Sequence, residues 1–322
     1  MKANPVRLAQ FSVETDLKGT QTRALYVNGR HQCKVYISIV KQVEDESGWK
    51  VVPLTPAEAS SATLQLYSTN PASGLPAGWH CDTWKNSYDS GLLNENSELE
   101  DIDQKAALGS ADVAPKQLLE RYLRIEPGRS NETRRFMASI RINGKIYTTN
   151  YTDDDTSFNS YVEVTPTVPY VLKTAQLQQF IDHTAFEGDI YRPRVKVYYW
   201  QPPPGLYFVE SLGLSDPLSI PNEGSHFQTA FLYMDFKGGV VVGKNSLGSR
   251  LFLSQIHKNV YPDKDPEVEF NLQPTAMRAV ALHYEGGHGD SKGTWQVVDN
   301  FGCQHSFRLV KGDYQYPIKI TD

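Results

Sequence analysis

The chain has 322 residues, enough for about two domains of ordinary size that each bury a core. Lys plus Arg number 32 against 37 Asp plus Glu, a net charge of −5, and this mild acidity argues against nucleic acid as a partner. Apolar residues at 39% and aromatic residues at 11% are typical of a globular protein and exclude a disordered or fibrous one.

The first residues, MKANPVRLAQFSVETD, lack the apolar core of a signal peptide, and no apolar run approaches the length of a membrane span. We therefore expect synthesis in the cytoplasm without a signal peptide. Release in a particle or by leaderless export stays open. The three cysteines, Cys33, Cys81 and Cys303, are too few for a disulfide scaffold, so we expect free thiols.

Alternating apolar and polar residues predict strands from the start of the chain, and Leu8 to Val13 is the first. In Arg23 to Val40 the alternation runs on both sides of Asn28-Gly29. Asn-Gly accepts a positive φ at both central positions of a type I′ turn, whose twist matches that of paired strands. This stretch therefore predicts a β-hairpin.

Short strands are also predicted at Trp49 to Val52 and at Thr63 to Tyr67, with the Pro- and Ala-containing segment 53–61 as their connection. Ser68 to Gly91 is expected to form a structured loop that carries large rings. The acidic run 94–103 predicts a solvated excursion.

Asp112 to Ile125 fits a helix or a strand. We favour the strand because a second Asn-Gly hairpin follows, formed by 135–142, Asn143-Gly144 and 145–151. A strand at 160–165 ends this half, and prolines 166 and 169 mark a boundary. We expect one β-sandwich domain at 1–165 and a second β-rich domain at 166–322.

The second half predicts one further helix, Thr174 to His183, with Leu177, Phe180 and Ile181 on one face. Two hairpins are predicted, around 237–239 and around 299–302. Other strands are expected at 194–200, 206–209, 251–257, 268–272 and 279–284. The predicted fold class is mainly β, with two β-sandwich-like domains joined by a Pro-marked linker and at most one or two short helices.

The run RFMASIRINGKIYTTN, Arg135 to Asn150, follows a succession of short strands and precedes a closing strand and the proline-marked linker. This arrangement resembles the immunoglobulin-like β-sandwich modules of bacterial surface proteins and of phage or phage-tail-like particles. The resemblance covers residues 1 to 165 and implies a sandwich architecture. The Cys, Trp, Cys spacing of antibody domains is absent, and the second half resembles no family that we can name. Architecture alone does not fix a function.

Common catalytic motifs are missing from the sequence. We find no GxxxxGK[ST] phosphate loop, no GxGxxG that opens a helix and no GxSxG elbow. The sequence therefore predicts neither an enzyme nor a cofactor. A hydrolase that acts on glycans through two carboxylates stays as a third alternative, because such pairs have no sequence spacing to search for.

A polar, glycine-rich stretch between residues 283 and 290 is the candidate metal site. His283, Glu285, His288 and Asp290 carry the imidazole and carboxylate groups that bind zinc or another divalent ion. The alternative is a hairpin loop with polar decoration. The acidic runs 153–155 and 263–265 are candidate calcium ligands, although neither has the EF-hand spacing.

Aromatic rings give a third class of candidate site. Tyr198 and Trp200 share one face of a predicted strand, and Trp79 and Trp84 lie in the predicted loop. Such rings either stack on sugars, fill a protein interface or pack in the core. We therefore name these four residues as candidate ligand-binding residues, with core packing as the alternative.

Together these features predict a non-catalytic binding or assembly protein, such as a structural or adhesive component of a phage or phage-tail-like particle or a bacterial surface ligand. Protein partners, self-assembly or a glycan fit this prediction. The alternative is a leaderless secreted toxin component that oligomerises and inserts a β-hairpin, for example from Gly238 to Leu253, into a membrane as part of a β-barrel pore. A membrane is a partner in this alternative alone.

Overall fold

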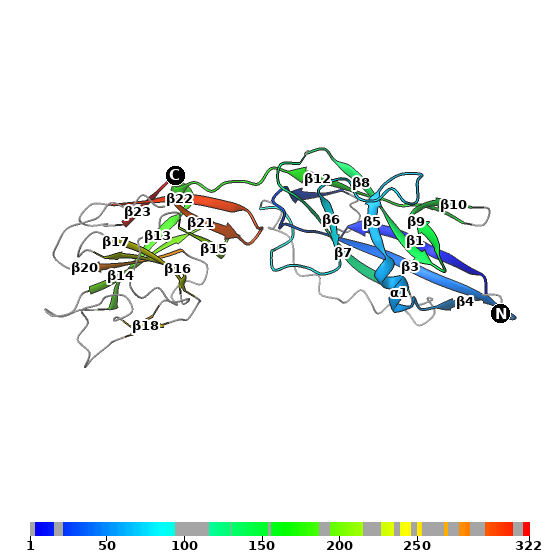
Figure 1. The fold of residues 1–322 in the computed structure, drawn as a ribbon, viewed down its shortest axis with the longest axis horizontal. Helices are drawn as coiled ribbons and strands as arrows, with labels where there is room; N and C mark the ends of the chain where they lie inside the picture. Colours follow the sequence, from blue (N-terminus) through cyan, green and yellow to red (C-terminus); the bar gives the residue numbers. More distant parts are fainter. Residues whose placement is uncertain are drawn as a thin grey trace. The chain divides into compact units, whose positions relative to one another are not determined.

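The structure, a computed structural model, describes residues 4–15, 22–93, 116–129, 131–153, 156–186, 194–214, 227–234, 239–245, 250–252, 267–269, 277–283, 294–311 and 318–322. Among these residues it contains many strands, one short α-helix and one 3-10 turn, so the prediction of a mainly β fold is confirmed (Figure 1). The chain forms two compact units: unit 1, Met1–Pro169, and unit 2, Tyr170–Asp322.

Unit 1 contains two five-stranded sheets. Sheet A has the order β1-β3-β7-β6, with β4 paired to β3, and sheet B has the order β2-β12-β8-β5, with β9 paired to β8. The strands of sheet A are β1 (Val6–Thr15), β3 (Cys33–Asp45), β4 (Gly48–Val52), β6 (Trp79–Asp82) and β7 (Gln117–Ile125). Those of sheet B are β2 (Thr22–Tyr26), β5 (Thr63–Leu66), β8 (Arg134–Ile142), β9 (Lys145–Thr148) and β12 (Val162–Thr167). A separate hairpin consists of β10 (Asn150–Thr152) and β11 (Ser157–Asn159).

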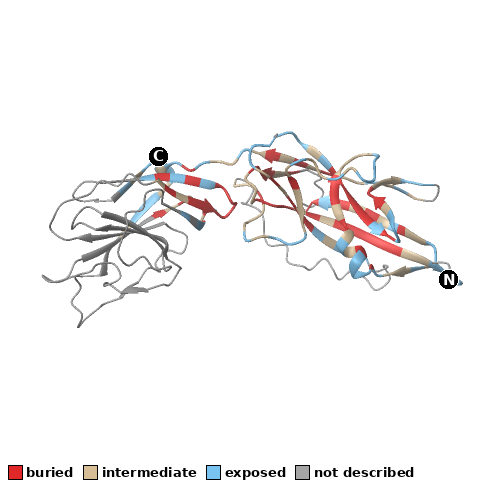
Figure 2. Cartoon of the chain, in the orientation of Figure 1, coloured by how far each residue is buried: buried red, intermediate tan, exposed pale blue. Residues whose placement is uncertain are grey.

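The core of unit 1 lies between these two sheets. Val35 and Ile37 of sheet A and Phe136 and Ile140 of sheet B belong to one buried cluster. Across the layers, the ring of Trp79 lies 4.7 Å from that of Phe136, measured between centroids. Figure 2 shows buried positions recurring along the strands of unit 1, as expected where one face of each sheet is turned inward.

The two Asn-Gly sequences of unit 1 have different structures. Asn143 and Gly144 have φ values of 49° and 81°, and they join β8 to β9 as a hairpin, as predicted. The hairpin prediction for Arg23 to Val40 is wrong, because β2 lies in sheet B and β3 in sheet A. Strand β2 runs parallel to β12 instead. The strands before and after Asn28-Gly29 both bury apolar residues, β2 from sheet B and β3 from sheet A. The chain therefore passes from one sheet to the other at this turn instead of folding back on itself.

A short helix, α1 (Pro56–Ser61), occupies the segment that the sequence predicted as a plain connection. Its start is a capping box: the Glu58 amide donates to Thr55 Oγ1 at 3.2 Å, and the Thr55 amide donates to Glu58 Oε2 at 2.8 Å. Proline in the first turn fits the helix without loss of a hydrogen bond. The T-P-A-E sequence therefore carried a helix signal that the prediction overlooked.

Two buried cations fix α1 to sheet A. Lys41 Nζ on β3 donates to both carboxylate oxygens of Glu58 at 2.7 Å. Arg121 on β7 donates from Nε to the Ala62 carbonyl at 2.7 Å and from its terminal nitrogen to the Ala59 carbonyl at 2.8 Å. These two carbonyls lie at the C-terminal end of the helix, where acceptors lack their i+4 donors, although the Ala59 carbonyl also accepts from the Ala62 amide at 3.3 Å. The helix is thus bound to the sheet at both of its ends.

The strands predicted at 8–13, 49–52, 63–67 and 160–165 are confirmed, with small changes of boundary, by β1, β4, β5 and β12. The acidic run 94–103, predicted as a solvated excursion, lies outside the described residues. The strand interpretation of the segment that ends at Ile125 is confirmed by β7. The predicted loop 68–91 contains the short strand β6, which pairs with β7.

Unit 2 also contains two main sheets, with orders β13-β14-β20-β16-β17 and β15-β21-β22-β23. The first comprises β13 (Gln178–Phe186), β14 (Arg194–Gln201), β16 (Phe227–Met234), β17 (Gly239–Asn245) and β20 (Met277–His283). The second comprises β15 (Phe208–Leu214), β21 (Thr294–Asp299), β22 (Gln304–Lys311) and β23 (Ile318–Thr321), and β18 (Arg250–Phe252) pairs with β19 (Glu267–Glu269). Trp200 of β14 and Trp295 of β21 meet edge to face, with ring centroids 6.3 Å apart.

The predicted helix Thr174 to His183 is wrong. The chain makes the 3-10 turn η2 (Thr174–Gln176) and then enters β13, which pairs with β14. Phe180, which the helix would have turned toward a core, is exposed. Pairing with a neighbouring strand outweighs a weak helical preference. Both predicted hairpins of unit 2 are confirmed, as β16 with β17 and β21 with β22.

Candidate functional site

The site that combines an exposed aromatic ring with a fixed polar network lies at one end of sheet A. Its first part is the corner between β2 and β3. Asn28 Oδ1 accepts hydrogen bonds from the amides of Arg30 at 2.9 Å and His31 at 2.7 Å, and Gly29 has a φ of 75°. The asparagine side chain thereby closes a tight turn on its own backbone. The turn places Gln32, the residue before β3, at the end of sheet A where β3 begins.

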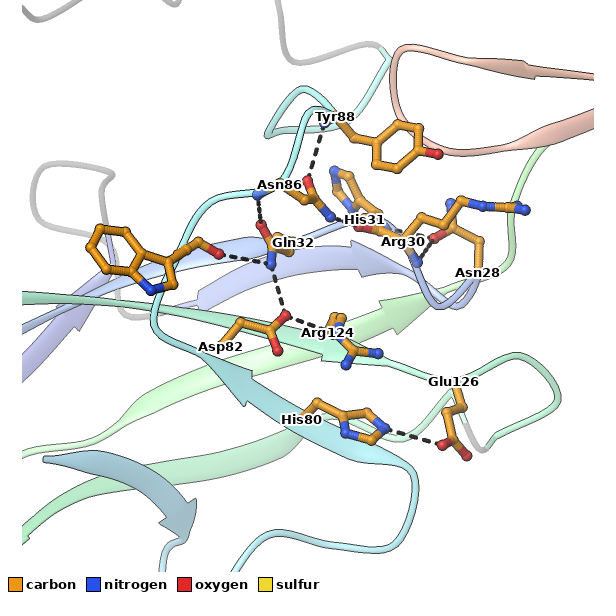
Figure 3. A network of polar contacts seen from close by, with 11 residues as sticks. Asn28, Arg30, His31, Gln32, His80, Asp82, Asn86, Tyr88, Arg124 and Glu126 are labelled. Carbon is orange, nitrogen blue, oxygen red and sulfur yellow. Dashed lines mark hydrogen bonds and ion pairs between the residues drawn. The ribbon is translucent and has the colours of Figure 1, made fainter. Parts of the chain in front are cut away.

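Gln32 joins this corner to the loop that follows β6. We call residues 83–90 the Trp84 loop. Gln32 Nε2 donates to Asp82 Oδ2 at 2.8 Å and to the Trp84 carbonyl at 3.3 Å, and Gln32 Oε1 accepts from the Asn86 amide at 2.8 Å (Figure 3). Gln32 is buried, and both ends of its amide have partners. One side chain therefore fixes the backbone on both sides of residue 85.

Asn86 continues the network along the loop. Its Nδ2 donates to the Arg30 carbonyl at 2.5 Å, and its Oδ1 accepts from the Tyr88 amide at 3.1 Å. Further on, the Leu93 amide donates to the hydroxyl of Tyr26 at 3.2 Å. The loop has no regular secondary structure, yet Gln32 of the corner and Asn86 of the loop itself bond to its backbone at Trp84, Asn86 and Tyr88, which keeps it ordered.

Five charged or titratable side chains beside the Trp84 loop, namely His80, Asp82, Arg124, Glu126 and Arg129, are paired with one another. Arg124 Nε lies 2.8 Å from Asp82 Oδ2, the oxygen that also accepts from Gln32. Beside this pair, Glu126 Oε1 lies 3.1 Å from His80 Nε2, and Glu126 Oε2 lies 2.9 Å from Arg129 (Figure 3 shows the first of these). The Arg129 guanidinium, followed by His80, holds the pKa of the Glu126 carboxyl below its ordinary value. The site thus offers fixed dipoles and no large net charge.

Trp84 stands out from this network because its side chain faces water. It is 83% exposed, although its own carbonyl is hydrogen-bonded to Gln32. A fixed backbone that presents an exposed indole is suited to stacking on a ligand.

The other predicted ring residues have different positions. Trp79 and Trp200 are 7% and 3% exposed, so these rings pack in the cores of their units. This burial favours the alternative of core packing for these two rings. For Tyr198 the structure describes the strand backbone alone.

The predicted metal ligands lie mostly outside the described residues. This holds for Glu285, His288 and Asp290, while His283 is described as the last residue of β20 without its side chain. Among the described residues, no three His, Cys, Asp or Glu side chains come together as a metal site requires. The calcium candidates 154–155 and 263–265 likewise lie outside the described part. Both metal sites therefore stay predictions.

A buried Asp-His pair in unit 2 has the composition of a catalytic dyad, but its contacts are structural. His305 Nε2 lies 2.9 Å from Asp299 Oδ2, and His305 Nδ1 accepts from the Leu172 amide at 3.1 Å. Asp299 Oδ1 accepts from the amides of Phe301 and Cys303 at 2.9 Å, and the Tyr170 hydroxyl donates to Oδ2. Both ring nitrogens of the buried histidine are occupied, so the pair stabilises the turn between β21 and β22.

No protein-family model matches this chain, and no match is found among curated proteins.

Within the described residues, no helix combines the length and apolar character that crossing a membrane requires. The three cysteines are free thiols, as expected.

Sequence reasoning named Trp84 but missed the residues that hold it. Gln32, Asp82 and Asn86 carry no local motif, because the bonds from Gln32 to Asp82, Trp84 and Asn86 join positions 50 or more residues apart. The S/T/N/D-rich composition of the stretch after Asp82 indicates a loop and nothing about its partners.

Proposed function

We propose that this chain is a non-catalytic binding or assembly protein and that the Trp84 loop is its recognition element. The observation that carries the proposal is the 83% exposure of Trp84 on a backbone fixed by Gln32 and Asn86. Folding gains nothing from an indole left in water, since burial of such a ring is favourable. Exposed, ordered tryptophans are enriched among residues that dominate binding energy.

The scaffold supports this proposal. A two-layered β unit with a packed core holds its loops in fixed positions, and binding residues are commonly placed on such loops. We include in the proposal that unit 1 is immunoglobulin-like. Two facing layers support this, antiparallel except for the parallel pair of β2 and β12, as does a chain that changes sheet between β2 and β3. The finer assignment is a structural or adhesive subunit of a phage or phage-tail-like particle, or a bacterial surface ligand. It rests on the resemblance carried by residues 135–150.

The use of the charged groups favours binding over catalysis. At the Trp84 loop, Asp82 is paired with Arg124 and Gln32, and Glu126 with His80 and Arg129. A general acid needs a proton-donating atom directed at the substrate, and a general base needs a proton-accepting one. These carboxylates are instead directed at neighbouring side chains of the protein.

The test measures binding of the fluorescently labelled full chain to a panel of whole bacterial cells and cell-wall preparations, together with its native mass. We expect surface binding that falls when Trp84→Ala is introduced and persists in Leu118→Ala, a matched change of another exposed apolar residue of unit 1. The absence of both surface binding and self-assembly would overturn the proposal. Dye release from liposomes would favour the pore-forming alternative instead.

A further inference from the structure

The chemical surroundings of Trp84 narrow the kind of ligand that it fits. Its neighbours Thr83, Lys85 and Ser87 are all exposed and polar. Among the described residues of unit 1, the other exposed large apolar side chains are Leu118, on β7, and Val168, near the end of the unit. The indole is therefore an isolated apolar face within a hydrophilic surface.

An isolated ring is too small for the core of a protein interface. A tryptophan side chain of about 250 Å² that is 83% exposed presents roughly 200 Å². A stable protein interface takes about 800 Å² from each partner and has an apolar centre several side chains wide. The Trp84 ring supplies about a quarter of that area, and its polar neighbours do not extend it.

Pyranose rings match this combination of one flat apolar face and a polar rim. The axial C–H groups of such a sugar carry a small positive charge and pack on the negative face of an indole, while its hydroxyls need hydrogen-bond partners. Asp82, Arg124, His80 and Glu126 are partly exposed, and Asp82 shares a hydrogen-bonding amide with the Trp84 carbonyl. Because Asp82 is paired with Arg124 and Glu126 with His80, these groups offer hydrogen-bonding atoms to a neutral sugar without needing a charged ligand, and the exposed Lys85 adds one cation beside the ring.

We propose that the Trp84 loop binds a neutral glycan, with one sugar ring stacked on the Trp84 indole and its hydroxyls directed toward the Asp82–Arg124 pair. This inference rests on the proposed binding function and names its ligand class. Gln32 and Asn86 fix the loop before the ligand arrives, so binding loses little conformational entropy in this segment.

The test is affinity electrophoresis of the full chain in native gels that contain neutral polysaccharides, namely dextran, mannan, galactan, soluble β-glucan and glycol chitin. We expect at least one of them to retard the chain, and we expect Trp84→Ala to weaken that binding by about tenfold or more. Trp84→Tyr keeps a stacking face and should retain most of the retardation. Leu118→Ala is the matched control and should bind within about twofold of the unchanged chain.

The outcomes separate the inference from the proposed function. Equal retardation of Trp84→Ala and the unchanged chain would overturn the site. Absence of retardation by every polysaccharide would overturn the glycan class, whereas Trp84-dependent binding to cells could still support the broader function. A melting temperature of Trp84→Ala equal to that of the unchanged chain shows that loss of binding does not come from unfolding, and exposure of the ring leads us to expect this equality.

Discussion

Replacing Lys41 by methionine is expected to destabilise unit 1 by about 3 kcal/mol at neutral pH. The Lys41 and Glu58 side chains are 9% and 10% exposed, and the ammonium donates to both oxygens of the carboxylate. Removing one member of a buried ion pair typically costs about 3 to 5 kcal/mol because the other charge stays desolvated. The small remaining exposure of both groups places this pair at the lower end of that range.

The cost of Lys41→Met should depend on pH. Burial acts to raise the pKa of Glu58, but the hydrogen bonds from Lys41 and Thr55 outweigh it and hold that pKa below its ordinary value. The pair therefore contributes stability above the unfolded pKa of about 4.3, and this contribution is lost as the pH falls through the folded pKa. In Lys41→Met, burial acts without the ammonium, so Glu58 binds a proton more readily. The difference between the two proteins should shrink as the pH falls from about 7 to about 4.

The assay is urea unfolding of the full chain, followed by hydrogen-exchange mass spectrometry so that peptides of unit 1 are read separately from those of unit 2. The control is Lys41→Met combined with Glu58→Gln, which keeps an oxygen for the Thr55 amide and removes the buried charge. This double variant should recover more than about half of the lost free energy of unfolding. A cost below about 1 kcal/mol, or one that does not change with pH, would refute the reasoning.

Three further predictions concern single positions. Gly144→Ala should destabilise unit 1 by about 1 kcal/mol through backbone strain alone, because Gly144 has a φ of 81° and an added Cβ meets nothing within 4 Å; chemical denaturation measures this, and an unchanged midpoint would contradict it. Asp299→Asn should destabilise unit 2 by about 2 kcal/mol, because the amide NH₂ of the new side chain would face Nε2 of His305, which carries the ring proton when Nδ1 accepts from Leu172. Hydrogen exchange of unit 2 measures this, and the same exchange in the variant and the unchanged chain would argue against a proton on Nε2. Gln32→Leu should speed amide exchange at residues 83–90 by about tenfold without unfolding unit 1, and unchanged exchange there would show that Gln32 does not hold the loop.

Comparison of the two Asn-Gly sequences shows how far local pattern determines the fold. Alternation and turn chemistry correctly predicted the β8–β9 hairpin, where both turn residues have a positive φ. The same dipeptide at Asn28 has a different use, since its side chain accepts two backbone hydrogen bonds and the flanking strands enter different sheets. Local sequence permits either result. The choice depends on which layer buries each strand, and this is a long-range property.

The fold class was predictable because period-two alternation recurs along the chain. A mistake at one element leaves the prediction of a mainly β fold unchanged. The helix α1 was missed although its capping box is local. The segment of β13 was mistaken for a helix because Leu177, Phe180 and Ile181 have the i, i+3, i+4 spacing of a helical face. The sequence also could not tell which of Trp79 and Trp84 is buried. They lie five positions apart, yet one packs on Phe136 and the other faces water.

The wrongly predicted hairpin and the candidate site have one physical origin. A tight turn at Asn28-Gly29 would have paired the residues before it with β3 and would have placed Gln32 within that ladder. Because the chain crosses from sheet B to sheet A instead, Gln32 lies just before β3, and its side-chain amide faces the Trp84 loop. It can therefore bond to Asp82, to the Trp84 carbonyl and to the Asn86 amide. The crossing that buries the two layers against each other also fixes the loop that presents the exposed indole, so the stability of this corner and the affinity of the proposed site should change together.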